Sequence, residues 1–172
     1  MLDYAYFHQG ELYDCLRETL KNKDLYFYLM FPSKFFFFRI YENDRDAIQF
    51  VSKNSDGKII GFLSAYADNE NNLIENMDFI NFTGKPNATF SHDSKLFFDE
   101  LFIKRNFRKI IFKAIVKNPA VPMYRKLVKK LNGREVGILK ENKKLTDGKY
   151  YDEMIFELYR DGYLNAIKTL KK

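Results

Sequence analysis

The side chains most often used in catalysis and metal binding are scarce in this sequence. It has two histidines, His8 and His92, and a single cysteine, Cys15. Neither histidine has companions at the spacing of a metal-binding motif, so no metal site is expected. Cys15 lies in the helical pattern Leu12-Cys15-Leu16, which suits a small core residue, and a lone cysteine excludes an intrachain disulfide framework. The remaining proton-transfer groups are carboxylates, tyrosines and lysines, whose positions depend on the fold.

The composition is that of a globular chain with an unusual aromatic content. Hydrophobic residues make up 46% and charged residues 30% of the 172 residues, with 18 Phe, 12 Tyr and no Trp. Scattered aromatic residues usually belong to a core, although aromatic-rich surfaces can also stack nucleic-acid bases. The formal charge of +6 comes mostly from lysines spread along the chain. Such lysines fit a solvated surface as well as an anionic partner, whether nucleic acid or a phosphorylated small molecule.

The sequence carries no signal for secretion or membrane insertion. Asp3 and Tyr4 stand where a signal peptide would need a basic and then an apolar run. The longest apolar block, the phenylalanine run at residues 35–38, is far short of a membrane span. No repeat or Pro/Gly-rich linker divides the chain. We therefore expect one cytoplasmic domain covering residues 1–172, with no membrane partner.

Apolar spacing and turn residues predict an alternation of strands and helices. Residues 1–8 fit a first strand, and residues 10–20 fit an amphipathic helix. Residues 24–30 fit either a second short helix or an extended segment, and residues 33–43 a flap or short strand. The rest of the chain predicts, in order, a hairpin at 46–68, a strand at 73–82, a helix from about Ser94 to Asn106, a strand at 108–116, a helix at 120–132 and a closing hairpin.

The closing hairpin has the clearest local signal. In "LTDGKYYDEMIFEL" the pair Asp147-Gly148 stands between alternating apolar positions, and such a tight turn needs φ > 0 at its centre. A helix that follows one strand and leads to another suggests a parallel crossover within a mixed sheet. The fold class predicted is α/β with a central sheet.

Three stretches and this element order resemble the GNAT superfamily of N-acetyltransferases. "VKNPAVPMYRKL" is similar to the family's strand-to-helix junction, in which Ala120, Tyr124 and Lys126 fit the family's spacing. "GREVGILKENKKLTDGKYYDEMIFEL", with Gly137 at its start, looks like the family's final hairpin, and "GKIIGFLSAY" is like its third strand. The resemblance implies a mostly antiparallel sheet, splayed between two parallel strands, with helices on both faces.

The resemblance also implies acetyl-CoA as co-substrate and assigns site residues. In the family the cofactor enters the gap between the splayed strands and its pyrophosphate sits on the N-terminus of the next helix, in keeping with the affinity of helix N-termini for anions. Carried onto this sequence, the acid that protonates the leaving thiolate is Tyr124, and Glu75 or Asp78 is the base, acting directly or through water. The cofactor-binding positions are Phe79, Ile80, Asn81, Phe82, Gly84, Lys85, Asn87, Ala88 and Asn118.

One predicted feature works against anion binding at that helix. With the helix starting near Ser94, Asp93 falls at its first turn, where a carboxylate satisfies the helix end itself and repels a phosphate. Lys85, His92 and Lys95 would offset this repulsion only in part.

Two classes of function follow from the resemblance. The first is an acetyl-CoA-dependent N-acetyltransferase acting on a small-molecule or peptide amine, and the second is a GNAT-fold binding protein that has lost its cofactor site. Tyr124 also lies on the apolar side of its helix, so a purely structural role fits it as well. A nucleic-acid binder using Lys126, Lys129 and Lys130 is the weakest option. The acceptor pocket is expected from residues 25–46, and the sequence identifies neither the acceptor nor the oligomeric state.

Overall fold

The computed structural model describes residues 1–22, 39–42, 45–145 and 147–169. Its strands are β1 (Leu2–Tyr4), β2 (Ala47–Lys53), β3 (Ile59–Asp68), β4 (Leu73–Asn81), β5 (Lys109–Ile115), β6 (Arg134–Lys144) and β7 (Tyr150–Tyr159). Its helices are α1 (Gln9–Lys21), α2 (Ala88–Asp99), α3 (Val121–Lys130) and α4 (Arg160–Thr169), with a 3-10 turn at Ala5–His8 and a π-helical turn at Glu100–Lys104. The segment predicted at 24–30 and the phenylalanine run at 35–38 lie outside the described residues.

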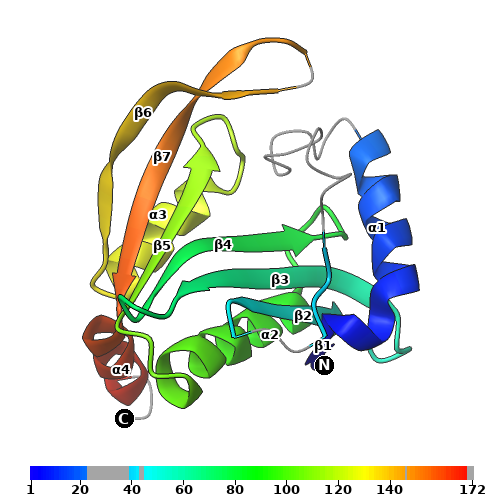
Figure 1. The fold of residues 1–172 in the computed structure, drawn as a ribbon, viewed down its shortest axis with the longest axis horizontal. Helices are drawn as coiled ribbons and strands as arrows, with labels where there is room; N and C mark the ends of the chain where they lie inside the picture. Colours follow the sequence, from blue (N-terminus) through cyan, green and yellow to red (C-terminus); the bar gives the residue numbers. More distant parts are fainter. Residues whose placement is uncertain (23–38, 43–44, 146, 170–172) are drawn as a thin grey trace.

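The strands form one mixed sheet in the order β1-β2-β3-β4-β5-β7-β6. Every neighbouring pair is antiparallel except β4 and β5, which are parallel. Figure 1 shows β4 and β5 beginning side by side and then running apart, so that the sheet opens in its middle. The splayed mixed sheet expected from the sequence is confirmed.

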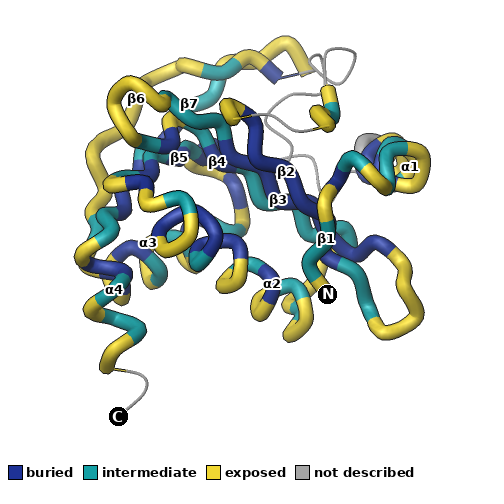
Figure 2. Tube along the Cα trace, turned by 60° about the horizontal axis from the view of Figure 1, so that its bottom comes forward, coloured by how far each residue is buried: buried dark blue, intermediate teal, exposed yellow. Residues whose placement is uncertain are grey.

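Two apolar clusters cover the two faces of the sheet. On one face Phe50, Leu63 and Phe112 pack with Phe97 and Phe98 of α2, and residues of α3 and α4 complete this large cluster. On the other face a smaller cluster, including Val51 and Phe62, packs under α1. Figure 2 shows α2, α3 and α4 along one side of the sheet. We call these the α2 face and the α1 face.

Both predicted hairpins are present, and each turn forms for the reason its sequence suggests. Gly57 (φ 80°) closes the β2–β3 turn and Gly148 (φ 78°) the β6–β7 turn, which is the left-handed region that glycine adopts without strain. The Oδ1 atom of Asn54 accepts hydrogen bonds from the backbone of Asp56 and Lys58 and fixes the first turn. The Oδ1 atom of Asp147 does the same for Lys149.

Three element predictions need correction. The first strand ends at Tyr4, because the chain turns into a 3-10 helix that buries Ala5. The helix expected from about Ser94 begins at Ala88, since Asn87 caps it. The C-terminal helix α4 was not expected, although Tyr163, Ala166 and Ile167 follow the spacing of an amphipathic helix and join the large cluster.

Candidate active site

A β-bulge at Glu75 opens the sheet. Along β3 and β4, Ala67 stands opposite Ile74 and Tyr66 opposite Asn76, so Glu75 is an extra residue in β4. An extra residue bends the strand that carries it and increases its twist. In the described residues β4 pairs with β5 only at Leu73 and Ile74, immediately before this bulge. The bulge therefore marks the point at which the two parallel strands separate.

Beyond the bulge, β4 offers one edge to an extended ligand. The strand remains paired with β3 as far as Asn81, but within the described residues no strand pairs with its other edge after Ile74. Phe79, one of the predicted cofactor positions, points to the α2 face and packs against Phe97 and Phe98 at ring distances of 5.8 and 5.5 Å. Ile80 and Phe82 join the smaller cluster on the α1 face. The side chains of these three residues therefore pack in the two apolar clusters.

The α1 face changes from apolar to polar along the strands. Residues directly opposite one another in a sheet share a face. Val51 and Phe62 stand in one row, and Ile80 pairs with Phe62 to complete it. The next two rows are polar and consist of Gln49–Ser64–Asp78 and Ala47–Tyr66–Asn76. We call the five polar residues of these rows (Gln49, Ser64, Tyr66, Asn76 and Asp78) the polar rows.

Hydrogen bonds orient the members of the polar rows. The Nδ2 atom of Asn76 donates to Oδ2 of Asp78 at 3.2 Å. Gln49 is buried and bridges to residues 39–41, accepting from the backbone N–H of Tyr41 at 3.0 Å and donating to the carbonyl of Arg39 at 2.9 Å. Asp78, a predicted base, is thereby held in a fixed polar surrounding on the face that α1 only partly covers.

Tyr66 stands next to Asp78 as a neutral phenol. Burial, and then the nearby Asp78 carboxylate and Tyr41, raise the pKa of Tyr66 above its ordinary value, although a hydrogen bond with Gln49 acts in the opposite direction. The phenol therefore keeps its proton at neutral pH and can donate it in a hydrogen bond. Glu75, the other predicted base, is exposed on the bulge, one residue before the polar rows begin at Asn76.

The loop between β4 and α2 is built around Asn81. Its Oδ1 atom accepts from the backbone N–H and hydroxyl of Thr83, and its Nδ2 atom donates to the carbonyl of Lys85 at 2.8 Å. Gly84 takes a left-handed conformation with φ 66°. The side chain of Asn81, a predicted cofactor position, is thus already used to shape the loop that leads to α2.

The first turn of α2 has open N–H groups and no carboxylate. Asn87 caps the helix by accepting from the N–H of Phe90 at 2.9 Å. Within the described residues, no acceptor is paired with the N–H groups of Ala88 and Thr89. Such groups at a helix start favour an anion. Asn87 and Ala88 therefore form a helix N-terminus whose N–H groups favour an anion, and Lys85 lies in the loop before it.

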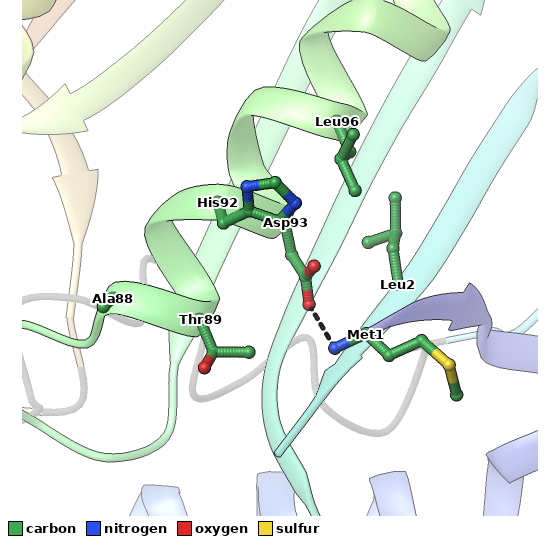
Figure 3. A pocket seen from close by; sticks show the side chains of 7 residues that line it. All are labelled: Met1, Leu2, Ala88, Thr89, His92, Asp93 and Leu96. Carbon is green, nitrogen blue, oxygen red and sulfur yellow. Dashed lines mark ion pairs between the residues drawn. The ribbon is translucent and has the colours of Figure 1, made fainter. Parts of the chain in front are cut away.

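The expectation that Asp93 opposes anion binding is wrong. Because α2 starts at Ala88, Asp93 lies beyond its first turn, and its side chain is only 1% exposed. It accepts from the hydroxyl of Ser52 at 2.7 Å and forms an ion pair with the amino group of Met1 at 3.0 Å (Figure 3). Asp93 thus joins α2 to β1 and β2 and does not face an anion at the helix start.

Close packing of α2 on β3 requires a glycine. A Cβ atom at Gly61 would overlap the ring of Phe90. Phe90 is in the first turn of α2, so the absence of a side chain at Gly61 lets the helix start lie directly against the sheet. This is the central glycine of the third strand noted in the sequence.

Tyr124 and Asn118 lie on the other side of the gap. Tyr124 projects from α3 onto the α2 face, where its ring meets Phe112 edge-on at 5.4 Å and Phe156 at 6.0 Å. Asn118 is buried at the turn from β5 into α3, and its Oδ1 atom accepts from the N–H of Ala120 at 2.8 Å. Asn118 therefore fixes the start of the helix that carries Tyr124.

An open cavity of about 560 Å³ lies beside the N-terminal half of α2. It is lined by Met1, Leu2, Ala88, Thr89, His92, Asp93 and Leu96 (Figure 3). Of the predicted cofactor positions it includes only Ala88, and no residue of β4 or β5 lines it. The cavity is therefore separate from the gap between the splayed strands.

The sequence does not predict Gln49, Ser64 and Tyr66 as residues of the site. A usable signal was present, because each is a polar residue inside an otherwise apolar strand, in "AIQFVSK" and "IIGFLSAYAD". Polar residues on different strands indicate a site only when the register of the sheet places them side by side. The sequence alone does not give that register. Their alignment with Asp78 is a finding of the structure.

Cys15 packs against the smaller cluster, and burial, followed by Glu11 and Asp14, raises the pKa of its thiol. Among the described residues, no group of three or more His, Cys, Asp or Glu side chains could hold a metal ion. None of the helices in the described ranges combines the length and apolar character needed to cross a membrane.

Comparisons by sequence find no match, either among protein-family models or among curated proteins. Comparison with solved structures does find similar folds. Spermidine/spermine N-acetyltransferase SpeG of Vibrio cholerae, in complex with manganese ions, matches with a TM-score of 0.61 and 21% identity over 72% of this chain and 71% of that one. A proposed acetyltransferase from T. thermophilus matches with a TM-score of 0.57 and 16% identity, over 74% of this chain and 66% of that one.

A further proposed acetyltransferase matches with a TM-score of 0.59 and 16% identity over 72% of this chain. The match spans 62% of that structure, which is less than two thirds of its length. At these identities the similarity is one of fold. The sheet order, the single parallel pair and the splay at β4 and β5 agree with it, so this chain has the GNAT fold.

Proposed function

We propose that this protein is an N-acetyltransferase that uses acetyl-CoA as acetyl donor and a small amine as acceptor. The observation that carries the proposal is the splay of β4 from β5, which leaves one edge of β4 open along a path that ends at the capped start of α2. An extended amide-containing ligand can pair with a strand edge, and a pyrophosphate suits a helix N-terminus.

The residues of this path fit the cofactor. Phe79, Ile80 and Asn81 lie on the part of β4 beyond its pairing with β5, whereas Phe82 follows β4 and donates its N–H to the carbonyl of Ile60. Gly84 and Lys85 lie in the loop that leads to α2, and Asn87 and Ala88 form its start. The first turn of α2 contains no acidic residue. Asn118 supports the site indirectly through the β5–α3 turn. When bound there, acetyl-CoA supplies an activated thioester carbonyl.

Asp78 is the base in this proposal. An amine must lose a proton to become a nucleophile, and a carboxylate held near the reacting centre accepts it directly or through water. Asp78 lies in the polar rows beside a neutral Tyr66, whereas Glu75 is exposed at the bulge. Tyr124, on the opposite face, holds the proton that a leaving thiolate needs.

The acceptor class rests on the comparison. The Vibrio cholerae neighbours are spermidine N-acetyltransferases by name, and on that basis we propose a small amine rather than a protein. The alternative of a binding protein without catalysis receives no support from these neighbours.

The test is acetyl-CoA-dependent thiol release with a panel of small primary amines. Asp78→Asn is expected to lower kcat/KM by about 100-fold or more, because general base catalysis contributes on this order. Glu75→Gln is the matched control and should stay within about threefold of the wild type, a range comparable to the effect of one exposed charge. Equal losses in the two variants contradict the assignment of Asp78. An absence of thiol release with every amine contradicts the proposed function.

A further inference from the structure

The α1 face of β5, β7 and β6 carries more positive than negative side chains. By register, the charged residues of this face include Lys109 and Lys113 on β5, Glu153 and Glu157 on β7, and Arg134 and Lys143 on β6. Four cationic groups thus share the face with two carboxylates. This half of the sheet borders the gap on the side opposite to Asp78 of β4.

Both carboxylates of this face lie close to cations and are buried. Glu157 forms ion pairs with Lys109 and with Arg134, the latter at 2.8 Å, and accepts from the hydroxyl of Tyr159 at 2.7 Å. Glu153 is fully buried, accepts from Asn142 through Oε2, and has Lys143 at 3.7 Å from Oε1. Glu157 is therefore fully engaged, whereas Oε1 of Glu153 has no hydrogen-bond partner among the described residues but is buried away from a ligand in solvent.

Lys113 is the cation that remains. It is half-buried, and it has no hydrogen-bond or ion-pair partner among the residues that the structure describes. Its partner on β7 is Ile155, and the partner of Ile155 on β6 is Gly137. A Cβ atom at Gly137 would meet nothing within 4 Å, so the row that contains Lys113 is open at its β6 end.

Asp78 and Lys113 lie at matching positions along the two strands that border the gap. The last paired residues are Ile74 of β4 and Ile110 of β5. Three residues after the bulged Glu75 comes Asp78, and three residues after Ile110 comes Lys113. Both lie on the α1 face. A carboxylate and a cation therefore border the opening from its two sides.

We propose that the acceptor is a small primary amine that also bears an anionic group, a carboxylate or a phosphate. Its ammonium end lies at Asp78 and its anionic end at Lys113. This inference rests on the proposed function and specifies its substrate. A polyamine would bring a second positive charge to a face whose carboxylates are buried close to cations, and like charges at one interface are disfavoured.

The experiment compares four amines of similar length in the thiol-release assay: γ-aminobutyrate, phosphoethanolamine, n-butylamine and putrescine. The wild type is expected to prefer γ-aminobutyrate or phosphoethanolamine over putrescine by about tenfold in kcat/KM, as one partly exposed charge contact allows. The two anionic amines distinguish carboxylate from phosphate recognition.

Lys113→Glu is expected to reduce the ratio of anionic amine to putrescine by about tenfold or more, since it converts attraction into repulsion. Lys113→Met, which removes the charge and retains the length, gives an intermediate ratio and covers the case in which the reversed charge disturbs folding. Lys126→Glu, on the exposed side of α3, is the control and should leave the ratio unchanged.

The outcomes separate this inference from the function on which it rests. If the wild type acetylates putrescine as well as or better than the anionic amines, the inference is overturned while acetyl transfer stands. The same conclusion follows if Lys113→Glu leaves the ratio unchanged. If no amine releases thiol, the proposed function fails, and the substrate class fails with it.

Discussion

Asp78 and Tyr124 approach the gap between β4 and β5 from opposite faces of the sheet. Asp78 shares a row with Gln49 and Ser64 on the α1 face, and Tyr124 packs on Phe112 and Phe156 on the α2 face. In an acyl transfer the attacking group and the leaving group need separate partners for their protons. Because the gap opens to both faces of the sheet, Asp78 can serve the attacking amine from one face and Tyr124 the leaving thiolate from the other.

Tyr124→Phe tests the acid role separately from packing. The phenylalanine ring keeps the contacts with Phe112 and Phe156, so the melting temperature should stay within a few degrees of the wild type. If the hydroxyl donates the proton, kcat should fall by about 100-fold with little change in the affinity for acetyl-CoA. An unchanged kcat would show that Tyr124 is a core residue only.

The pKa of Glu157, on the α1 face, is strongly lowered. Burial raises its pKa, but hydrogen bonds from Lys109, Tyr159 and Arg134 outweigh burial and lower the pKa from 4.5 to about 2. The folded state therefore holds this carboxylate ionised at pH values where the unfolded chain binds a proton. Its contribution to stability is present above about pH 4.5 and is lost as the pH falls toward 2.

Glu157→Gln should therefore show a stability deficit that depends on pH. Near pH 7 the lost contribution is about 3 kcal/mol, from the linkage between pKa and stability. Denaturant unfolding of the two proteins from pH 7 down to pH 3 measures the difference, which should shrink steadily below about pH 4.5. A difference that is constant over this range would mean that the ion pairs do not stabilise the fold.

The end of α3, the start of β6 and the start of α4 meet at two glycines. A Cβ atom at Gly133 would overlap the carbonyl oxygen of Glu157, and one at Gly162 would overlap the carbonyl oxygen of Leu131. Both obstacles are backbone atoms, which cannot move aside as a side chain can. The contact between α4 and the end of α3 therefore depends on the missing side chain at Gly162.

Gly162→Ala and Gly10→Ala make a matched pair, because each glycine lies near the start of a helix. At Gly162 the overlap with Leu131 should destabilise the protein by about 1–3 kcal/mol. At Gly10 nothing lies within 4 Å, and alanine should be neutral or add up to about 1 kcal/mol through helix propensity. Thermal unfolding of both variants checks this. Similar melting temperatures would contradict the packing of α4 on α3.

The elements that the sequence predicts well are those with local causes. The turns at Gly57 and Gly148 need left-handed glycines, and the flanking strands alternate, so both hairpins follow from a few adjacent residues. The start of α2 was misplaced because Asp93, a buried carboxylate, interrupts the apolar spacing that leads back to Phe90. Asn87, a favoured N-cap residue, was the signal that could have corrected it.

The site depends on causes that are not local. The bulge at Glu75 is defined by how β4 pairs with β3, and the splay by how β4 pairs with β5. From the sequence, Glu75 and Asp78 are equal candidates for the base. The register distinguishes them, because Glu75 is the bulged residue and Asp78 belongs to the polar rows. For the same reason, the sequence of each strand taken alone does not predict that Lys113 and Asp78 lie on opposite sides of the gap.

At the scale of the molecule, the sheet consists of two parts joined at a short parallel contact. Strands β1 to β4 carry α1 on one face and α2 on the other, and β5, β7 and β6 carry α3 and α4. The two parts meet through Leu73 and Ile74 on one side and Lys109 and Ile110 on the other. The open edge of β4 and the start of α2 both border this division, and together they form the proposed acetyl-CoA site.

Calorimetric titration of acetyl-CoA tests whether the cofactor binds at the open edge of β4 and the start of α2. The wild type should show saturable binding at one site. Ala88→Phe, which adds bulk at the first residue of α2, should weaken binding by about tenfold or more. Ser55→Phe places the same ring in the exposed β2–β3 turn and should bind as the wild type does. Absence of binding at roughly millimolar acetyl-CoA, or equal affinity in the wild type and Ala88→Phe, would contradict the account.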